Sequence, residues 1–203
     1  MKIIRSILGE LETNCYILLD EETMEAAIID PADEAETLRD AIENLGATLK
    51  YILLTHGHRD HTLAAPALHE MFPDAAVYIH SADKGQVGIY RYPMDELIGG
   101  DLKFYDDGDT LPLGRLTIEV IATPGHTGGS VCLKCGDALF TGDTLFAGSM
   151  GRIDLPGARP DKMMSSLARL AKLEGDYDVY PGHMDTTTMA RERQYNLYIK
   201  MLR

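Results

Sequence analysis

Short apolar runs separated by turn residues dominate the first part of the chain, a pattern typical of β-strands joined by tight connections. Cys15–Leu19 and Ala26–Ile29 are two such runs, and the polar residues 20–23 between them predict the turn of a hairpin. Tyr51–Leu54 is a continuous apolar run that indicates a buried strand, and Ala76–Ile79 indicates another.

The second part of the chain repeats this pattern. Leu116–Ile121 alternates between apolar and polar residues and predicts a strand. Val131–Cys135 and Ala138–Phe140 predict a second hairpin, because the intervening pair Gly136-Asp137 favours the positive φ of a tight turn. Asp178–Tyr180 predicts a further short strand.

Apolar residues spaced by three and four positions predict helices between these strands. Gly46 and Gly175 follow two of the helices as candidate C-terminal caps, and Pro66 lies in the first turn of a third. Segment 85–100 lacks this periodicity and predicts a long loop with one helical turn near Met94–Leu97. The helices are expected at residues 33–45, 62–72, 161–174 and 186–203.

Strands followed by helices occur in each half of the chain, and this order favours two packed sheets with helices outside. We therefore expect an α/β protein with an αββα sandwich, in which two mixed β-sheets lie face to face and helices cover both outer faces. A length of 203 residues fits one domain with a sizeable core, so the prediction is a single domain over residues 1–203.

The charge of the chain excludes some classes of binding partner. A formal net charge of −13 argues against nucleic acid and against an anionic membrane surface, since both are bound by clustered Lys and Arg.

No apolar run has the length of a signal-peptide core or a membrane span, so we expect a cytoplasmic protein. Three cysteines do not suggest a disulfide framework. Both a monomer and a homodimer stay open.

Histidine and aspartate residues are most closely spaced directly after the predicted strand at 51–54. His56, His58, Asp60 and His61 fall within six consecutive positions, and a helix is predicted after them. Gly57 allows a sharp turn between two of the imidazoles. Imidazole and carboxylate together are ligands that zinc and iron bind in proteins. A solvated loop is the alternative, but such a loop does not require this density of histidine and aspartate.

Three more residues of the same chemistry follow predicted strands. His126, Asp143 and His183 each come directly after a glycine, which allows the backbone to bring side chains from separate strands to one point. A single residue of this kind is more often a turn or cap residue, but three in matching settings favour a shared site. Five of the seven histidines and two aspartates are thereby brought together, enough for two metal ions.

The order of these residues resembles that of a known family. His-x-His-x-Asp-His at 56–61, followed by Gly-His, Gly-Asp and Pro-Gly-His, resembles the metallo-β-lactamase superfamily over residues 14 to 196. Asn14–Tyr16, Thr141–Phe146 and Gly148–Arg152 are most similar to the glyoxalase II (hydroxyacylglutathione hydrolase) branch. Glyoxalase II carries an added C-terminal helical region that binds glutathione. Only 20 residues follow His183, so the resemblance is to a short single-domain form.

The resemblance implies a centre of two divalent metal ions, with zinc favoured over iron or manganese. It also implies a small-molecule thioester or ester substrate, attacked by a hydroxide that bridges the ions and is oriented by Asp60. Asp143 would bridge both ions. Some antibiotic-hydrolysing relatives have cysteine at that place, which favours a binuclear hydrolase over a β-lactamase. The implied ligands are His56, His58 and His126 for the first ion and Asp60, His61 and His183 for the second.

Substrate contacts are less clearly marked in the sequence than metal ligands. Tyr90, Arg91 and Tyr92 in the irregular segment are candidates, as is Arg152 after a glycine-rich segment. The alternative is that the tyrosines pack against a sheet and that Arg152 pairs with Asp154.

Three classes of function follow from these residues. A binuclear hydrolase of a thioester is favoured, with another ester or a lactone as a variant. The second class is a mononuclear iron oxidoreductase similar to persulfide dioxygenases, which use two histidines and one aspartate around one iron. A non-catalytic metal-stabilised module is disfavoured, because the ligand set is complete. Cys132-x-x-Cys135 lies within one predicted strand, which favours a structural role over a redox role.

Overall fold

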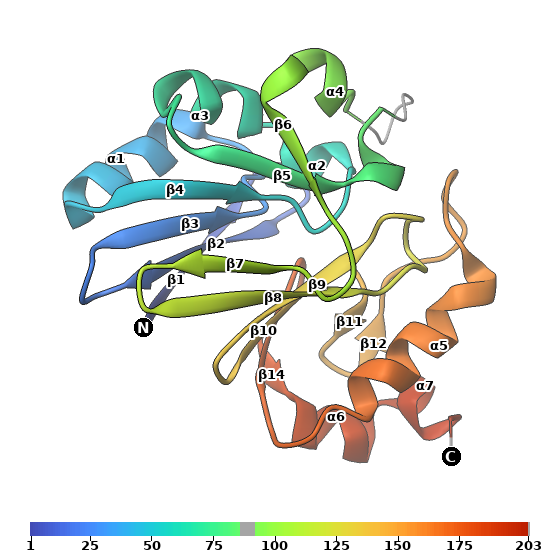
Figure 1. The fold of residues 1–203 in the computed structure, drawn as a ribbon. Helices are drawn as coiled ribbons and strands as arrows, with labels where there is room; N and C mark the ends of the chain where they lie inside the picture. Colours follow the sequence, from blue (N-terminus) through green and yellow to red (C-terminus); the bar gives the residue numbers. More distant parts are fainter. Residues whose placement is uncertain (86–91, 203) are drawn as a thin grey trace.

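Two six-stranded β-sheets pack face to face in the computed structural model, which describes residues 1–85 and 92–202 (Figure 1). In the first sheet the strands follow the order of the sequence, with β1 to β3 antiparallel and β3 to β6 parallel. Its strands are β1 (Lys2–Leu8), β2 (Thr13–Asp20), β3 (Glu25–Ile29), β4 (Thr48–Leu53), β5 (Ala76–His80) and β6 (Leu102–Tyr105).

The second sheet has the order β14-β13-β10-β9-β8-β7. β13 is parallel to β10, and the other neighbours are antiparallel, so both sheets are mixed as expected. A separate two-stranded ribbon pairs β11 with β12. These strands are β7 (Thr110–Leu113), β8 (Leu116–Ala122), β9 (Val131–Cys135), β10 (Ala138–Gly142), β11 (Leu145–Phe146), β12 (Ser149–Met150), β13 (Asp178–Pro181) and β14 (Thr187–Thr188).

Helices cover the outer face of each sheet. Figure 1 shows α1, α3 and α4 beside the first sheet and α5, α6 and α7 beside the second. The helices are α1 (Ala35–Leu45), α2 (Arg59–Thr62), α3 (Ala65–Met71), α4 (Met94–Leu97), α5 (Pro160–Ala171), α6 (Met189–Tyr195) and α7 (Leu197–Lys200), with 3₁₀ turns at Ser81–Asp83 and Gly99–Asp101.

Three apolar clusters separate the four layers. Ile17 and Leu19 of β2 pack outward with α1 and α3, while the alternate residues Tyr16 and Leu18 pack inward between the sheets. A third cluster joins the second sheet to α5 and includes Leu167. This alternation follows from the two-residue period of a strand, and it confirms the αββα sandwich.

Both hairpins are confirmed. β2 pairs with β3 in antiparallel register, and β9 pairs with β10 through Cys135 and Ala138. Gly136 in the second turn has φ of 58°, the conformation that its lack of a side chain allows. Gly46 caps α1 in the left-handed conformation, as expected.

The helix predicted at residues 62–72 is wrong as one element. The structure has the single turn α2, then Leu63 and Ala64, then α3. Pro66 lacks the N–H that would continue the hydrogen bonding of α2, and it lies in the first turn of α3 instead. The helix therefore begins earlier than expected, inside the histidine motif at Arg59.

The helix predicted at residues 186–203 is also wrong as one element, because β14, α6 and α7 occupy that segment. Asn196 interrupts it with extended backbone, and its side chain accepts hydrogen bonds from Tyr198 N and Ile199 N at the start of α7. The helix predicted at 161–174 ends earlier, at Ala171.

The irregular segment contains α4 at the place where a helical turn was predicted. Strands β1, β6 and β7 and the β11–β12 ribbon were not predicted, although β1 and β6 lie in the first sheet and β7 lies in the second. Among the residues that the structure describes, no helix is long and apolar enough to cross a membrane.

Candidate metal centre

The seven predicted ligands meet where strands of both sheets end. The motif at 56–61 follows β4, while His126, Asp143 and His183 follow β8, β10 and β13. β10 and β13 are parallel, and β8 runs in the same direction two strands away, so these ends lie at one edge of the sandwich. The sequence therefore places five of the seven side chains on loops, and Asp60 and His61 on the single turn α2, and a rigid scaffold holds these segments together.

A first cluster consists of three buried imidazoles. His58 Nδ1 lies 3.1 Å from His56 Nε2 and 2.9 Å from His126 Nε2. The three ring nitrogens converge within the distances that ligands of one metal ion keep from each other.

A second cluster lies beside the first. His61 Nε2 is 3.2 Å from His183 Nε2 and 3.6 Å from Asp60 Oδ2, and the Asp60 oxygen is 3.3 Å from His183 Nε2. His61 is buried, whereas Asp60 and His183 are partly exposed. This cluster therefore faces the solvent from which a substrate arrives.

Asp143 reaches both clusters. Its Oδ2 lies 3.3 Å from His126 Nε2 in the first cluster and 3.7 Å from His183 Nε2 in the second, and its Oδ1 lies 3.4 Å from His61 Nε2. Oδ1 is buried and makes no hydrogen bond with any described residue. A buried carboxylate oxygen of this kind needs a partner, and a cation supplies one. The donor set thus fits two metal ions that share Asp143.

Backbone carbonyls orient two of the imidazoles. His126 Nδ1 lies 2.7 Å from the oxygen of Arg152, and His183 Nδ1 lies 3.1 Å from the oxygen of Leu11. A carbonyl only accepts, so each Nδ1 carries a proton, and each Nε2 is the ring nitrogen left to face the centre.

Asp30 orients the imidazoles of the central motif in the same way. Its Oδ2 lies 2.9 Å from His61 Nδ1 and accepts a hydrogen bond of 2.6 Å from Thr55 Oγ1, which in turn lies 3.1 Å from His56 Nδ1. Thr55 N donates to the other Asp30 oxygen at 2.7 Å. Both oxygens of Asp30 are thus engaged behind the imidazoles, so Asp30 acts as their support rather than as a ligand.

The carboxylates make the centre strongly negative. Burial lowers the pKa of His61, but the charges of Asp143, Asp30 and Asp60 outweigh it and raise the pKa to about 10. Burial would raise the pKa of Asp60, but its hydrogen bond with His183 and the neighbouring imidazoles hold that pKa well below its usual range. The centre therefore stabilises positive charge, as a cation site must.

Glycines permit the close approach of the loops. A side chain at Gly182 would collide with Asp143 Oδ1 and His61, and one at Gly142 would collide with Thr55 Oγ1. The glycines before Asp143 and His183 therefore allow the loops to approach each other closely, as their positions in the sequence indicated.

Two supporting aspartates were not predicted. Asp30 follows β3, and no function was predicted for it. Asp83 is buried and accepts hydrogen bonds from Gly57 N at 2.9 Å, Thr127 Oγ1 at 2.6 Å and Gly129 N at 3.0 Å, so it joins the loops that carry three of the imidazoles. Asp30 directly follows a predicted strand and Asp83 lies in the turn after another, and these positions were the one signal that could have indicated them.

The candidate substrate residues are not gathered at the centre. Tyr92 is half-buried and packs against the outer core of the first sheet. Arg152 forms two hydrogen bonds with Asp154, of 2.7 and 2.9 Å, and is exposed. Tyr90 and Arg91 lie outside the described residues.

The sequence of this chain matches a known protein family and is similar to that of a known hydrolase. A model of the metallo-β-lactamase superfamily matches residues 8–183. The hydroxyacylglutathione hydrolase GloC of Haemophilus influenzae is 34% identical over 198 residues, which cover 93% of this chain and 93% of that protein.

Solved structures share the fold over nearly the whole chain. The crystal structure of the BLEG-1 B3 metallo-β-lactamase aligns with a TM-score of 0.85 and 30% identity, covering 98% of this chain and 99% of that one. TTHA1623, solved in a di-iron-bound form, aligns with a TM-score of 0.80 and 33% identity, covering 96% and 99%. The converging imidazoles and carboxylates, the matched family model and these shared folds establish that the chain belongs to the metallo-β-lactamase superfamily of metal-dependent hydrolases.

Proposed function

We propose that this protein hydrolyses a thioester at a centre of two divalent metal ions. The observation that carries the proposal is the position of Asp143 between two complete ligand clusters. The likeness to hydroxyacylglutathione hydrolase GloC supports a thioester as the substrate class. In this proposal His56, His58 and His126 hold one ion, Asp60, His61 and His183 hold the other, and both share Asp143.

Two bound divalent ions would lower the pKa of a shared water toward neutrality and polarise the carbonyl of the substrate. The low pKa of Asp60 keeps its carboxylate ionised at neutral pH, so it can accept a hydrogen bond from the attacking water and hold it toward that carbonyl. Thr13 Oγ1, 3.4 Å from Asp60 Oδ2, restrains the carboxylate from the outer side. Phe146 packs edge-on against His183, with ring centroids 6.2 Å apart, and forms an apolar wall.

A thiolate suits this centre as the leaving group. A free thiol has a pKa of about 8.5, so its anion departs without strong acid assistance. The proposal therefore favours a thioester over an unactivated ester.

Zinc is the metal that we propose first, because imidazole nitrogen and carboxylate oxygen are its usual ligands in hydrolases. Iron is the second candidate, because TTHA1623 was solved with two irons in the same fold. The second candidate function depends on iron and is the oxidation of a persulfide at a single iron. The complete second cluster of Asp60, His61 and His183 is compatible with both functions, so iron content and oxygen consumption are the measurements that separate them.

Thiol release from S-lactoylglutathione tests the proposal. We expect zinc-loaded protein to release thiol, a chelator to stop the release, and added zinc to restore it. Iron-loaded protein, given glutathione persulfide in an oxygen electrode, is the matched comparison. Oxygen consumption without any thioester hydrolysis would replace the proposed function with the oxidative one.

A further inference from the structure

A cavity of about 390 Å³ lies beside the metal centre, between the turn that joins β1 to β2 and the start of α2. Leu8, Leu11 and Leu63 form its apolar wall. Asp60 and Thr13 line it as well, and their hydrogen bond marks the end nearest the centre.

The cavity opens onto the second ligand cluster. Asp60 lines the cavity, and its Oδ2 is 3.3 Å from His183 Nε2. Leu11 also connects the cavity to the second cluster, because it lines the cavity and its carbonyl oxygen orients His183. A substrate whose reacting carbonyl lies at the centre can therefore extend one of its halves into this cavity.

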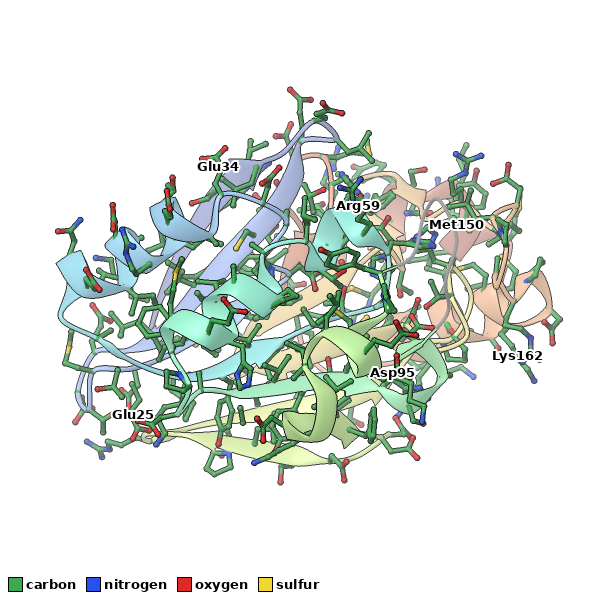
Figure 2. All side chains as sticks on the ribbon, turned by 90° about the horizontal axis from the view of Figure 1, so that it is seen from above. Glu25, Glu34, Arg59, Asp95, Met150 and Lys162 are labelled. Atoms are coloured by element: carbon green, nitrogen blue, oxygen red, sulfur yellow. The ribbon has the colours of Figure 1, made fainter. Side chains whose placement is uncertain are left out.

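Arg59 is the single cation among the residues that line the cavity. It is the first residue of α2 and is exposed, and Figure 2 shows it on that helix. Every other arginine of the described residues donates a hydrogen bond to an oxygen of the protein. The Arg59 side chain makes no hydrogen bond or ion pair with any described residue, although the chain has 32 acidic and 19 basic residues.

Three acidic residues line the cavity but do not engage Arg59, and one of them, Asp60, has its Oδ2 3.4 Å from Thr13 Oγ1 and 3.3 Å from His183 Nε2. Asp33 directs Oδ1 to the backbone N–H of Glu34 at 2.7 Å, and Glu10 is exposed on the β1–β2 turn. The guanidinium of Arg59 therefore keeps its fork of donors available, and that fork matches a carboxylate or a phosphate.

We propose that this cavity receives a substrate half that carries an anionic group, with Arg59 binding the carboxylate or phosphate and the three leucines packing on the chain that links it to the thioester. The proposal rests on the proposed thioester hydrolysis. It makes Arg59 a determinant of substrate selectivity, through a charged group that either the acyl half or the thiol half of the thioester can supply.

Three small thioesters separate these sources of charge. S-acetyl-N-acetylcysteamine is neutral, S-succinyl-N-acetylcysteamine is anionic in the acyl half, and S-acetyl-3-mercaptopropionate is anionic in the thiol half. We expect metal-loaded protein to prefer one anionic compound over the neutral one in kcat/KM. In Arg59→Gln that preference should fall about tenfold, mainly through KM, as expected for a lost charged hydrogen bond.

Two variants control for charge. Arg59→Lys keeps the charge and should retain most of the preference. Arg39→Gln removes an arginine that is paired with Asp40 on the surface of α1, and it should leave the preference unchanged. An equal preference in the wild type and Arg59→Gln, with all three compounds hydrolysed, would overturn the inference and leave the proposed function standing.

Binding of unreactive analogues makes the test independent of catalysis. In the matching thioethers a methylene replaces the thioester carbonyl, so they bind without reacting. By calorimetry we expect Arg59→Gln to bind the preferred anionic thioether about tenfold more weakly than the wild type does, at equal melting temperature and metal content. Equal affinities would overturn the inference. Failure to hydrolyse any of the three thioesters, with this difference in affinity intact, would instead count against the proposed function alone.

Discussion

At the scale of single residues, Asp143 is the side chain that would join the two proposed metal sites. Each cluster of three ligands contains its own histidines, but the oxygens of Asp143 lie within 3.3 to 3.7 Å of nitrogens in both. Asp30 and Asp83 act behind the ligands, because each accepts hydrogen bonds from the loops that carry them. Such supports matter because small displacements of ligands weaken metal binding.

Removal of the shared carboxylate should affect both sites. We expect Asp143→Ala to hold less than two metal ions per chain and to lose at least about 100-fold in thiol release, more than the loss of a supporting residue causes. Elemental analysis and the thiol assay measure both effects. Asp40→Ala, on the surface of α1, is the matched control and should change neither. Unchanged metal content in Asp143→Ala would show that the assignment of Asp143 is wrong.

The cysteines should be inert in the native protein. Cys132 packs outward toward α5 and Cys135 packs between the sheets, so the two thiols lie on opposite faces of β9. Burial raises the pKa of Cys132 to about 12 and also raises the pKa values of Cys135 and Cys15.

A thiol reagent reacts with the thiolate, whose fraction is small at any pH well below the pKa. At pH 8 we therefore expect slow labelling of all three cysteines in folded protein and rapid labelling after unfolding in denaturant. Rapid labelling of Cys132 or Cys135 in folded protein would contradict their structural role.

At the scale of elements, the C-terminal helices support one wall of the centre. Glu192 of α6 is buried and accepts hydrogen bonds from Gly148 N at 2.8 Å, Thr187 Oγ1 at 2.7 Å and Asn196 Nδ2 at 2.9 Å. Asn196 also donates to Ser149 O at 2.9 Å. These bonds hold the β11–β12 ribbon, which leads directly into the carbonyl that orients His126.

Loss of this carboxylate should loosen the ribbon. Glu192→Ala leaves several buried donors without acceptors, so we expect it to lower the free energy of unfolding by about 3 kcal/mol or more. Unfolding in urea measures the change. Glu70→Ala, at an exposed position of α3, should stay close to the wild type. A Glu192→Ala variant as stable as Glu70→Ala would show that the buried bonds contribute little.

At the scale of the whole molecule, the sandwich brings loops of both sheets to one edge, and only there do the ligands meet. The order of strands and helices in each half predicted the layers, and the glycine before each dispersed predicted ligand indicated where chain segments converge. Pro66 and Asn196 divided two expected helices, because a missing N–H and a side-chain cap override helical spacing. Asp30 and Asp83 were not identified, because their burial depends on contacts between distant segments.

Metal removal should destabilise the whole sandwich, because ions bound only in the folded state stabilise it. We expect protein treated with a chelator to melt roughly 5–10 °C below metal-loaded protein, given the size of the chain. Calorimetry measures the shift, and added zinc should reverse it. Equal melting temperatures would contradict a metal centre at this edge.

The most direct test of the account is thiol release from S-lactoylglutathione while zinc is added stepwise to metal-free protein. Seven ligands in two clusters joined by Asp143 predict that activity rises until two ions per chain are bound and then stays constant. Full activity at one ion per chain would contradict a binuclear hydrolase, and no thiol release at any ratio would contradict thioester hydrolysis itself.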